Sequence, residues 1–242
     1  MSLVTLDILG VPVTSAPMPE MIAHLNAQMG AGRRLKLAFL NAHASNLAAK
    51  DAAFRAALDG FLILNDGVGV DIAARRLHGV RFPDNLNGTD FVPAWLQQTK
   101  APLRLYLLGG REGVAGEAAE RLRALAPQHV IAGAANGYFP PEKTGEIVAA
   151  VAAAEADILL VAFGNPAQEI FIARHFDALG VKAAVGVGAL LDFLSGRVVR
   201  APGFFRKARL EWVWRLAREP GRLWRRYLLG NSQFLWRVIR RR

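Results

Sequence analysis

Residues 61–70 read FLILNDGVGV, and this stretch decides the fold class that we expect for the chain. Four apolar residues run directly into Asn65-Asp66-Gly67, and the chain then turns apolar again. A short apolar run that ends in a glycine turn and is followed by a helical stretch is typical of a strand buried on both faces. The run also delivers a carboxylate, Asp66, to the end of the strand. That carboxylate is either an ordinary turn residue or a group presented for chemistry.

The same alternation of apolar runs with alanine-rich stretches continues on both sides of residues 61–70. We expect strands at 36–40, 61–64, 104–108, 129–132, 157–163 and 182–187. We expect helices near 17–29, 44–58, 68–78, 89–99, 112–126, 143–154 and 166–179. Strands that alternate with helices predict a Rossmann-like α/β fold of three layers, α/β/α, in which helices cover both faces of a mostly parallel sheet.

The chain has 242 residues and a net charge of +10, and the positive charge is concentrated near the C-terminus. Residues 197–242 hold 14 Lys and Arg against two acidic residues, a net charge of +12, whereas residues 1–196 carry a net charge of −2. Four of the five tryptophans lie in the same C-terminal segment, and Pro202-Gly203 marks its start. We therefore predict an α/β domain over 1–200 and a basic, tryptophan-rich helical appendage over 201–242.

Several kinds of site and segment are not expected from this sequence. The absence of cysteine excludes disulfides and thiolate metal sites. The N-terminal residues MSLVTLDILGVPV have no basic region before a long apolar run, so we expect no signal peptide. No run of about 18 apolar residues is present, so we expect no membrane-spanning helix. The stretch GGREGVAG does not match the dinucleotide pattern GxGxxG, and the chain has no P-loop.

Nearly every expected strand ends in a glycine or a small polar residue. Ligands of parallel sheets bind at the carboxyl ends of the strands. Glycine lets backbone N–H groups approach a ligand there, and helix N-termini favour anions such as a diphosphate. Because turns between strands and helices often contain glycine anyway, these positions leave a turn role and a ligand role equally open. They are Gly67, Gly109, Gly110, Gly137, Gly164 and Gly188.

Taken together, the turn motifs resemble those of the WecG/TagA/CpsF family of bacterial glycosyltransferases. The matching segments are NAHASNLAAKDAAFRAAL (41–58), ILNDGVGV (63–70), NGTD (87–90), LYLLGG (105–110), NGYF (136–139), GNPAQE (164–169), VGVGALLDFLSGRVVRAP (185–202) and LEWVWRLAREPGRLWRRY (210–227). They follow the family's order and cover nearly the whole chain, and the last of them is long and specific.

The resemblance implies an inverting transfer of a hexose or N-acetylhexosamine from a UDP-sugar to a polyprenyl-diphosphate-linked glycan, in the synthesis of a surface polysaccharide. It also implies an enzyme that needs no metal and no other cofactor. The chain has no DxD motif that could supply carboxylates for a nucleotide-bound metal, and its five histidines are scattered. Such a transfer needs a base for the acceptor hydroxyl, and positive charge or N–H donors for the departing UDP.

Asp66 is the position that matches the family's proposed general base. The alternative is that its side chain caps the following helix in an Asx-turn. Asn41 ends the apolar run 36–40 and matches the asparagine of the family's first loop, so we expect it to line the same cleft.

Arginines of the C-terminal segment are the natural partners for the diphosphate, because a guanidinium pairs with two phosphate oxygens at once. The resemblance implies that Arg215, Arg222 and Arg225 reach into the site, and Arg200 in the Arg-Ala-Pro stretch is a further candidate. The alternative is that these arginines face anionic lipid.

The remaining expected substrate contacts follow the later strands. The resemblance implies that Gln168 contacts the sugar or the uracil. Pro166 and Glu169 join the substrate-binding set, although both also suit the first turn of a helix, where a carboxylate interacts well with the helix dipole. Gly137, Tyr138 and Phe139 are expected to flank the nucleotide, although an aromatic residue after a turn is equally often part of the core.

Two positions depart from the family's pattern and leave the donor sugar open. Phe39 stands where the family often has threonine, and Asn85 stands where it commonly has arginine. Both positions are plausible substrate contacts in N-acetylmannosaminyltransferases, and Asn85 stays in our substrate-binding set. The donor is therefore UDP-N-acetylmannosamine or another UDP-hexose such as UDP-glucose.

The C-terminal segment spaces its aromatic and aliphatic residues at helical intervals with arginines between them, as in helices that bind a membrane surface. We therefore expect a cytoplasmic protein that binds the inner face of the plasma membrane through this segment. The alternatives are that its apolar face packs on the body or that its basic residues bind nucleic acid, for which no motif is present. Two further functions stay open, a non-catalytic nucleotide-sugar-binding module and a nucleic-acid-binding protein. So does a homo-oligomeric state.

Overall fold

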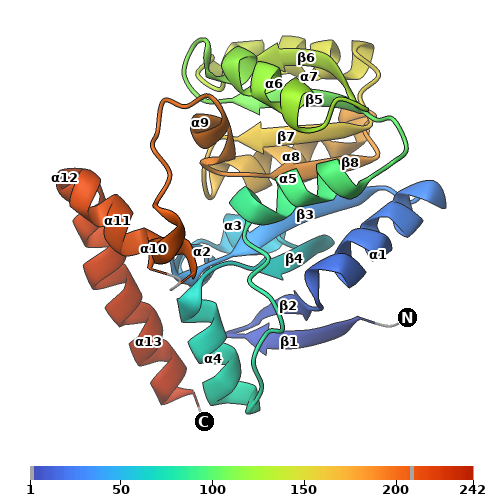
Figure 1. Ribbon diagram of the computed structural model, residues 1–242. Coiled ribbons are helices and arrows are strands. Elements are labelled where there is room, and N and C mark those ends of the chain that lie inside the picture. The colour runs from blue at the N-terminus through green and yellow to red at the C-terminus, as the bar shows by residue number, and fades with distance from the viewer. Residues whose placement is uncertain (1–2, 208–209, 242) are drawn as a thin grey trace.

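The computed structural model describes residues 3–207 and 210–241 and has helices on both sides of one sheet (Figure 1). The strands are β1 (Val4–Ile8), β2 (Val11–Ser15), β3 (Leu35–Leu40), β4 (Phe61–Asn65), β5 (Arg104–Gly109), β6 (Val130–Ala135), β7 (Ile158–Ala162) and β8 (Ala183–Gly186). The helices of the body are α1 (Met18–Gly30), α2 (Ala42–Ala48), α3 (Ala52–Ala57), α4 (Val68–His78), α5 (Gly88–Gln98), α6 (Val114–Leu125), the 3₁₀ turn η1 (Pro141–Lys143), α7 (Thr144–Ala153), α8 (Ala167–Leu179) and α9 (Leu190–Leu194). The C-terminal segment forms α10 (Gly203–Lys207), α11 (Glu211–Arg218), α12 (Pro220–Trp224), the π-helical turn η2 (Arg225–Leu229) and α13 (Gly230–Arg240).

The strands form one sheet in the order β1-β2-β4-β3-β8-β7-β5-β6. Every neighbouring pair in it is parallel except β1 with β2. The carboxyl ends of β3, β4, β7 and β8 therefore meet at one edge of the sheet. This arrangement confirms the predicted Rossmann-like α/β fold with a mostly parallel sheet.

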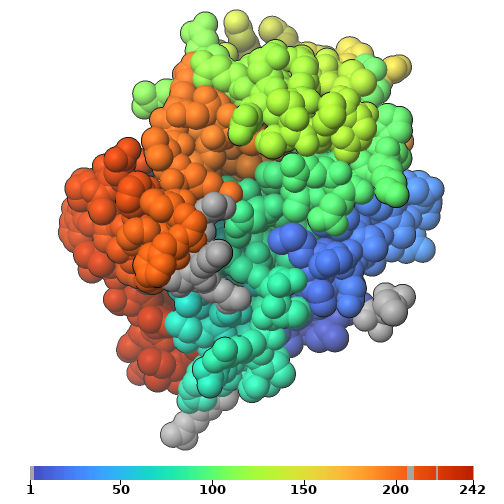
Figure 2. Space-filling model, viewed as in Figure 1, coloured from blue at the N-terminus to red at the C-terminus, as the bar shows by residue number. Residues whose placement is uncertain are grey.

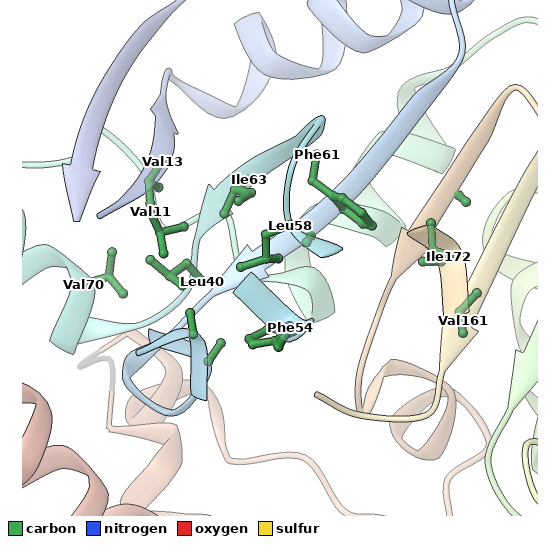
Figure 3. Packing of buried hydrophobic residues seen from close by; sticks show 14 of the residues in the cluster. Val11, Val13, Leu40, Phe54, Leu58, Phe61, Ile63, Val70, Val161 and Ile172 are labelled. Carbon is green, nitrogen blue, oxygen red and sulfur yellow. The ribbon is translucent and has the colours of Figure 1, made fainter. Parts of the chain in front are cut away.

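The core has two layers, one on each face of the sheet. Successive side chains of a strand point to opposite faces, so Leu159 and Val161 of β7 join one layer while Ile158 and Leu160 join the other. The first layer is covered by α2, α3, α4, α7, α8 and α13, and part of it is drawn in Figure 3. The second layer is covered by α1, α5, α6 and α9. Burial on both faces explains why the strands read as nearly continuous apolar runs.

The N-terminal hairpin of β1 and β2 was not expected from the sequence. Ile8 pairs with Val11, so the connection has only two residues, Leu9 and Gly10, with φ angles of 56° and 88°. A turn of this kind needs positive φ at both central residues, and Asn-Gly or Asp-Gly is its usual signature. Because the first central residue is Leu9, the sequence lacks that signature. The backbone N–H of Gly10 donates to Asp7 Oδ1 at 2.9 Å and helps to close the turn.

The single helix expected over 44–58 is wrong, because two short helices occupy this stretch. Asp51 is the N-cap of α3, so it separates α3 from α2. Its side chain accepts a hydrogen bond from the backbone N–H of Phe54 at 3.0 Å. An aspartate that bonds the backbone in this way favours a helix start over a helix interior. The break lets Phe54 turn into the core, where it is 1% exposed.

The C-terminal helix α13 lies along α2 and α4 rather than apart from the body (Figure 1). Its residues Phe234 and Val238 are 0% and 1% exposed and belong to the same core layer as α2 and α4. Burial of two such side chains contributes roughly 1.5–3 kcal/mol each. In the space-filling view the C-terminal segment, orange to red, forms one side of the molecule (Figure 2). The apolar face of α13 therefore packs on the body, which was one of the two alternatives for this segment.

Candidate active site

A cleft of about 1300 Å³ opens at the carboxyl ends of the parallel strands, between the sheet and the C-terminal helices. Its lining combines residues that follow β3, β4, β7 and β8 with residues of α11, η2 and α13. Ten of the residues that we expected at the site line it: Asn41, Asp66, Gly67, Asn85, Gly110, Tyr138, Gly164, Gln168, Gly188 and Arg215. The cleft therefore brings together positions that lie far apart in the sequence.

Asp66 is held at the end of β4 by contacts from both sides. Its backbone N–H donates to Leu40 O at 2.9 Å, and its Oδ2 accepts from Asn41 Nδ2 at 3.0 Å. The next residue, Gly67, has a φ of 88°, and its N–H donates to Asn85 Oδ1 at 2.8 Å. Helix α4 starts after Gly67 with no side-chain cap. The Asx-turn alternative for Asp66 is therefore not realised, and its carboxylate faces the cleft.

The surroundings of Asp66 make it a stronger base than an exposed carboxylate. Burial raises the pKa of the Asp66 carboxyl above its ordinary value of 3.8. The hydrogen bond from Asn41 and the charges of Arg226 and Arg215 pull the pKa back down, and the negative charge of Asp90 raises it. A carboxylate with a raised pKa is, when ionised, suited to take a proton from a hydroxyl group.

Asn41 has two roles that use both ends of its side-chain amide. It is the N-cap of α2, with Oδ1 accepting from the backbone N–H of Ala44 at 3.0 Å. Because Oδ1 is used in this way, the Nδ2 group is left to donate to Asp66. Asn41 thus orients the carboxylate from the neighbouring strand.

Two of the expected glycine contacts serve packing between turns instead of lining the cleft. A Cβ on Gly109 would come within 2.6 Å of Ala162 O, and a Cβ on Gly137 would come within 2.9 Å of the Cα of Gly109. The N–H of Gly137 donates to Gly110 O at 2.9 Å. These glycines let the turns after β5 and β6 lie against each other, and Gly110 alone of the three lines the cleft.

The aromatic residues after β6 divide between the cleft and the core. Tyr138 is 76% exposed and lines the cleft. Phe139 turns away and packs edge-on against Phe163, with ring centroids 5.8 Å apart. The structure therefore puts Tyr138 in reach of a ligand and Phe139 in the packing role that was its alternative.

Gln168 and Glu169 form a hydrogen-bonded clamp beneath the glycine turns. Gln168 Oε1 accepts from the N–H groups of Gly164 and Gly188 at 3.1 and 3.0 Å, so it ties the turn after β7 to the turn after β8. Glu169 Oε1 accepts from Gln168 Nε2 at 2.8 Å and from Asn165 Nδ2 at 2.6 Å. Both side chains are buried, and only Gln168 lines the cleft.

Glu169 belongs to the support of the site, not to its surface. It lies in the first turn of α8 beyond the N-cap residue Pro166, and neither residue lines the cleft. Glu169 is 0% exposed, and its Oε2 has no hydrogen-bond partner among the described residues. Burial is the main cause that raises the pKa of Glu169 to about 7.

The arginines of the C-terminal segment do not all face the cleft. Arg215 lines it, with its guanidinium 5.7 Å from the ring centroid of Phe193. Arg225 does not line the cleft but lies over the ring of Trp224. Its neighbour Arg226 lines the cleft. The only sequence feature that pointed to Arg226 was its position next to Arg225. Both residues lie in the π-helical turn η2, and only the side chain of Arg226 lines the cleft. The side chain of Arg222 lies outside the described part of the structure.

Arg200 is used within the protein, because its guanidinium donates to Thr89 Oγ1 and Asp90 Oδ1. Asp90 itself was missed at the sequence level although it belongs to the NGTD motif. Another missed residue is His43, which lines the cleft in the first turn of α2. Burial, helped by the charge of Arg226, lowers the pKa of His43 to about 4, so its imidazole is neutral near neutral pH.

Among residues 3–207 and 210–241, no three His, Asp or Glu side chains gather closely enough to hold a metal ion. Within the same ranges, no helix combines the length and the apolar character that crossing a bilayer requires.

Comparisons with known proteins identify the family of the chain. Residues 6–242 match the model of the Glycosyl transferase WecG/TagA/CpsF family. A similar protein is the N-acetylglucosaminyldiphosphoundecaprenol N-acetyl-beta-D-mannosaminyltransferase of Bacillus spizizenii, which is 35% identical over 167 residues. That match covers 69% of this chain and 63% of the relative, so the chain aligns with less than two thirds of the relative's length. Because the family match extends over nearly all of the sequence, the chain belongs to the WecG/TagA/CpsF family of glycosyl transferases.

Proposed function

We propose that this protein is an inverting glycosyltransferase that moves a sugar from a UDP-sugar to a polyprenyl-diphosphate-linked glycan. The observation that carries the proposal is the position of Asp66, a carboxylate with a raised pKa in a cleft that Arg215 and Arg226 also line. A base beside fixed positive charge is the combination that glycosyl transfer to a hydroxyl requires. The family and the activity in the relative's name support the same class of reaction.

In the proposed reaction Asp66 takes the proton from the acceptor hydroxyl. The acceptor oxygen attacks the anomeric carbon of the donor sugar as the bond from that carbon to the diphosphate oxygen breaks. The proton ends on Asp66, and UDP leaves with the electron pair of the broken bond. Attack on the face opposite the leaving group inverts the configuration of the anomeric carbon.

The negative charge that develops on the departing UDP is stabilised by other groups that line the cleft. Arg215 and Arg226 line the cleft, and their guanidinium groups supply positive charge and N–H donors. Fixed donors and cations of this kind stabilise a leaving diphosphate without a metal ion. We therefore propose a metal-independent transfer with no other cofactor.

The donor sugar is left open between two classes. Phe39 is 8% exposed, lines the cleft and packs against Phe91, with ring centroids 6.4 Å apart. Asn85 uses its Oδ1 on the N–H of Gly67. Phe39 and Asn85 offer an apolar ring and a neutral amide on this wall of the cleft. We propose a hexose such as glucose or an N-acetylhexosamine such as N-acetylmannosamine.

We also propose that the C-terminal helices bring the enzyme to the inner face of the plasma membrane, where a polyprenyl-linked acceptor resides. Apolar side chains of this segment face solvent beside arginines: Phe204, Trp224, Leu228, Leu229, Trp236 and Ile239 are between 41% and 76% exposed. Arg240 lies over the ring of Trp236 at 4.3 Å. Each basic residue near an anionic leaflet contributes about 1 kcal/mol, so several suffice for reversible binding.

A donor screen tests the proposal directly. The full chain is incubated with a short-chain polyprenyl-diphosphate-N-acetylglucosamine and each UDP-sugar, in buffer with a chelator, and products are identified by mass spectrometry. We expect one UDP-sugar to yield an acceptor heavier by one sugar residue, with inverted anomeric configuration by NMR. Absence of product with every donor, or product only after a divalent cation is restored, would contradict the proposal.

A further inference from the structure

Arg200 stands at a junction between the body and the C-terminal helices. Its guanidinium donates to Asp90 Oδ1 at 2.7 Å and to Thr89 Oγ1 at 3.0 Å, both in the first turn of α5. On its other side, Arg200 Nε lies 3.8 Å from Oε1 of Glu211, the first residue of α11. One guanidinium therefore bridges two carboxylates that belong to different parts of the fold.

The body side of this bridge is held by several hydrogen bonds. Asn87 caps α5, with Oδ1 accepting from the N–H of Asp90 at 3.0 Å and from Thr89 Oγ1 at 2.6 Å. Asn87 Nδ2 also donates to Asp90 Oδ2 at 2.9 Å, so both oxygens of that carboxylate are held. Behind this first turn, α5 is anchored by Phe91 and Trp95, which are fully buried. Arg200 is thus bound to a fixed point.

The other side of the bridge has little apolar anchoring of its own. Helix α11 has no buried residue, although its sequence is strongly amphipathic. Its tryptophans contact rings of the C-terminal segment: Trp214 packs on Phe205 and Trp212 packs on Tyr227. A helix that buries so little against the body gains little hydrophobic stabilisation there. Polar contacts to the body therefore matter more for where α11 lies.

Glu211 and Arg215 are one helical turn apart on α11, so they lie on the same face. Both line the cleft. The charge of Arg215 lowers the pKa of Asp66, and the charge of Asp66 raises the pKa of Glu211. The charge of Arg200 favours the ionised form of Glu211 against the effect of burial. A contact that fixes Glu211 over the body therefore also fixes Arg215 over Asp66.

We propose that Arg200 is a positioning residue that ties the first turn of α5 to α11 and so holds Arg215 in the cleft, instead of being a phosphate ligand itself. The role in catalysis rests on the proposed function, whereas the structural tie does not. Lysine would not replace Arg200 well, because a single ammonium cannot donate to Thr89 and Asp90 and also keep a second nitrogen 3.8 Å from Glu211.

Hydrogen exchange of the full chain tests the tie without reference to activity. In Arg200→Gln we expect amide exchange in residues 211–218 to rise at least tenfold, while exchange in β3, β4, β7 and β8 stays unchanged and reports an intact fold. Arg241→Gln is the matched control, since Arg241 also joins the C-terminal segment to the body, through Asp7 at 3.2 Å, away from the cleft. It should leave exchange in residues 211–218 unchanged.

Calorimetric titration with UDP and kinetics with the donor found in the screen test the consequence. We expect Arg200→Gln to lower kcat/KM about 100-fold and Arg200→Lys to recover less than a tenth of that loss. Asp90→Asn should lower it by a similar factor, and the double variant should be less than tenfold worse than either single one, because both changes break one bridge. The control should stay within threefold of wild type.

Two results would overturn the inference. One is unchanged exchange in residues 211–218 of Arg200→Gln together with weaker UDP binding, which would make Arg200 a direct phosphate ligand. The other is unchanged exchange with unchanged UDP binding. If no donor is ever transferred, the exchange comparison still decides the structural tie, so failure of the proposed function is separable from failure of this inference.

Discussion

Replacement of Asp66 by asparagine tests the proposed chemistry with the least disturbance to the fold. Asn41 Nδ2 donates to Asp66 Oδ2 at 3.0 Å, and an asparagine side chain keeps an oxygen at that place. The backbone bond from residue 66 to Leu40 O is independent of the side chain. The variant should therefore fold and bind UDP as the wild type does, while it has no group that can accept a proton.

The expected loss of transfer rate follows from the role of Asp66 as a general base. A positioned general base contributes roughly 10²–10⁴-fold in rate, which corresponds to about 3–5 kcal/mol of activation free energy. We expect kcat of Asp66→Asn to fall by this factor with little change in the KM for the donor. The assay is the initial rate of sugar transfer to a short-chain acceptor, followed by mass spectrometry, with UDP affinity measured by calorimetry.

The matched control is Asp59→Asn, which makes the same change at an exposed position before the opposite end of β4. It should keep wild-type rates. Turnover by Asp66→Asn within tenfold of wild type, in a preparation that binds UDP normally, would remove Asp66 from the role of base.

Three further predictions concern pH and stability. Asn41→Ala should move the acid limb of the kcat/KM profile to higher pH, because it removes a hydrogen bond that lowers the pKa of Asp66; a limb that stays in place or moves down would contradict this assignment. Glu169 has a folded-state pKa raised from 4.5 to about 7, so the wild type should lose stability relative to Glu169→Gln as pH rises from about 4.5 through 7, by on the order of 3 kcal/mol. Urea unfolding of both proteins across this pH range measures the difference, and a difference that does not change with pH would refute it. Phe234→Ala should lower the free energy of unfolding by about 3–5 kcal/mol, because Phe234 is fully buried between α2 and α4, whereas Trp236→Ala on the exposed face of α13 should cost under about 1 kcal/mol. Equal losses in chemical denaturation would mean that α13 is not part of the core.

The fold was largely predictable, because burial on both faces of a parallel sheet leaves a direct mark on the sequence. Apolar runs such as DILLVAF end in glycine turns and alternate with helical stretches, and the sheet follows this pattern closely. The N-terminal hairpin escaped prediction because its turn uses leucine where the usual signature has asparagine or aspartate. The division between α2 and α3 escaped because Asp51 acts as a cap inside an otherwise helical stretch.

The candidate site was predictable where a residue's role follows from its place at a strand end. Asp66, Asn41, Gly110 and Gln168 all line the cleft, as the rule for parallel sheets predicts. The rule does not say which residues near a strand end make contacts within the protein instead of facing the cleft. Phe139 packs on Phe163 against the core, and no feature of the sequence separates it from Tyr138.

The sequence by itself determined strands β3 to β8, the strand end that carries Asp66 and the charge of the C-terminal segment, because these depend on local pattern and composition. Only the tertiary structure decided how that charge is used. Arg215 and Arg226 face the cleft, Arg225 lies over Trp224, and Arg200 is bound to Asp90. All four are arginines in one basic stretch, and they differ only in what the folded chain places beside each guanidinium. That depends on contacts between segments more than 100 residues apart, such as Arg200 with Asp90 at a separation of 110, which no local pattern records.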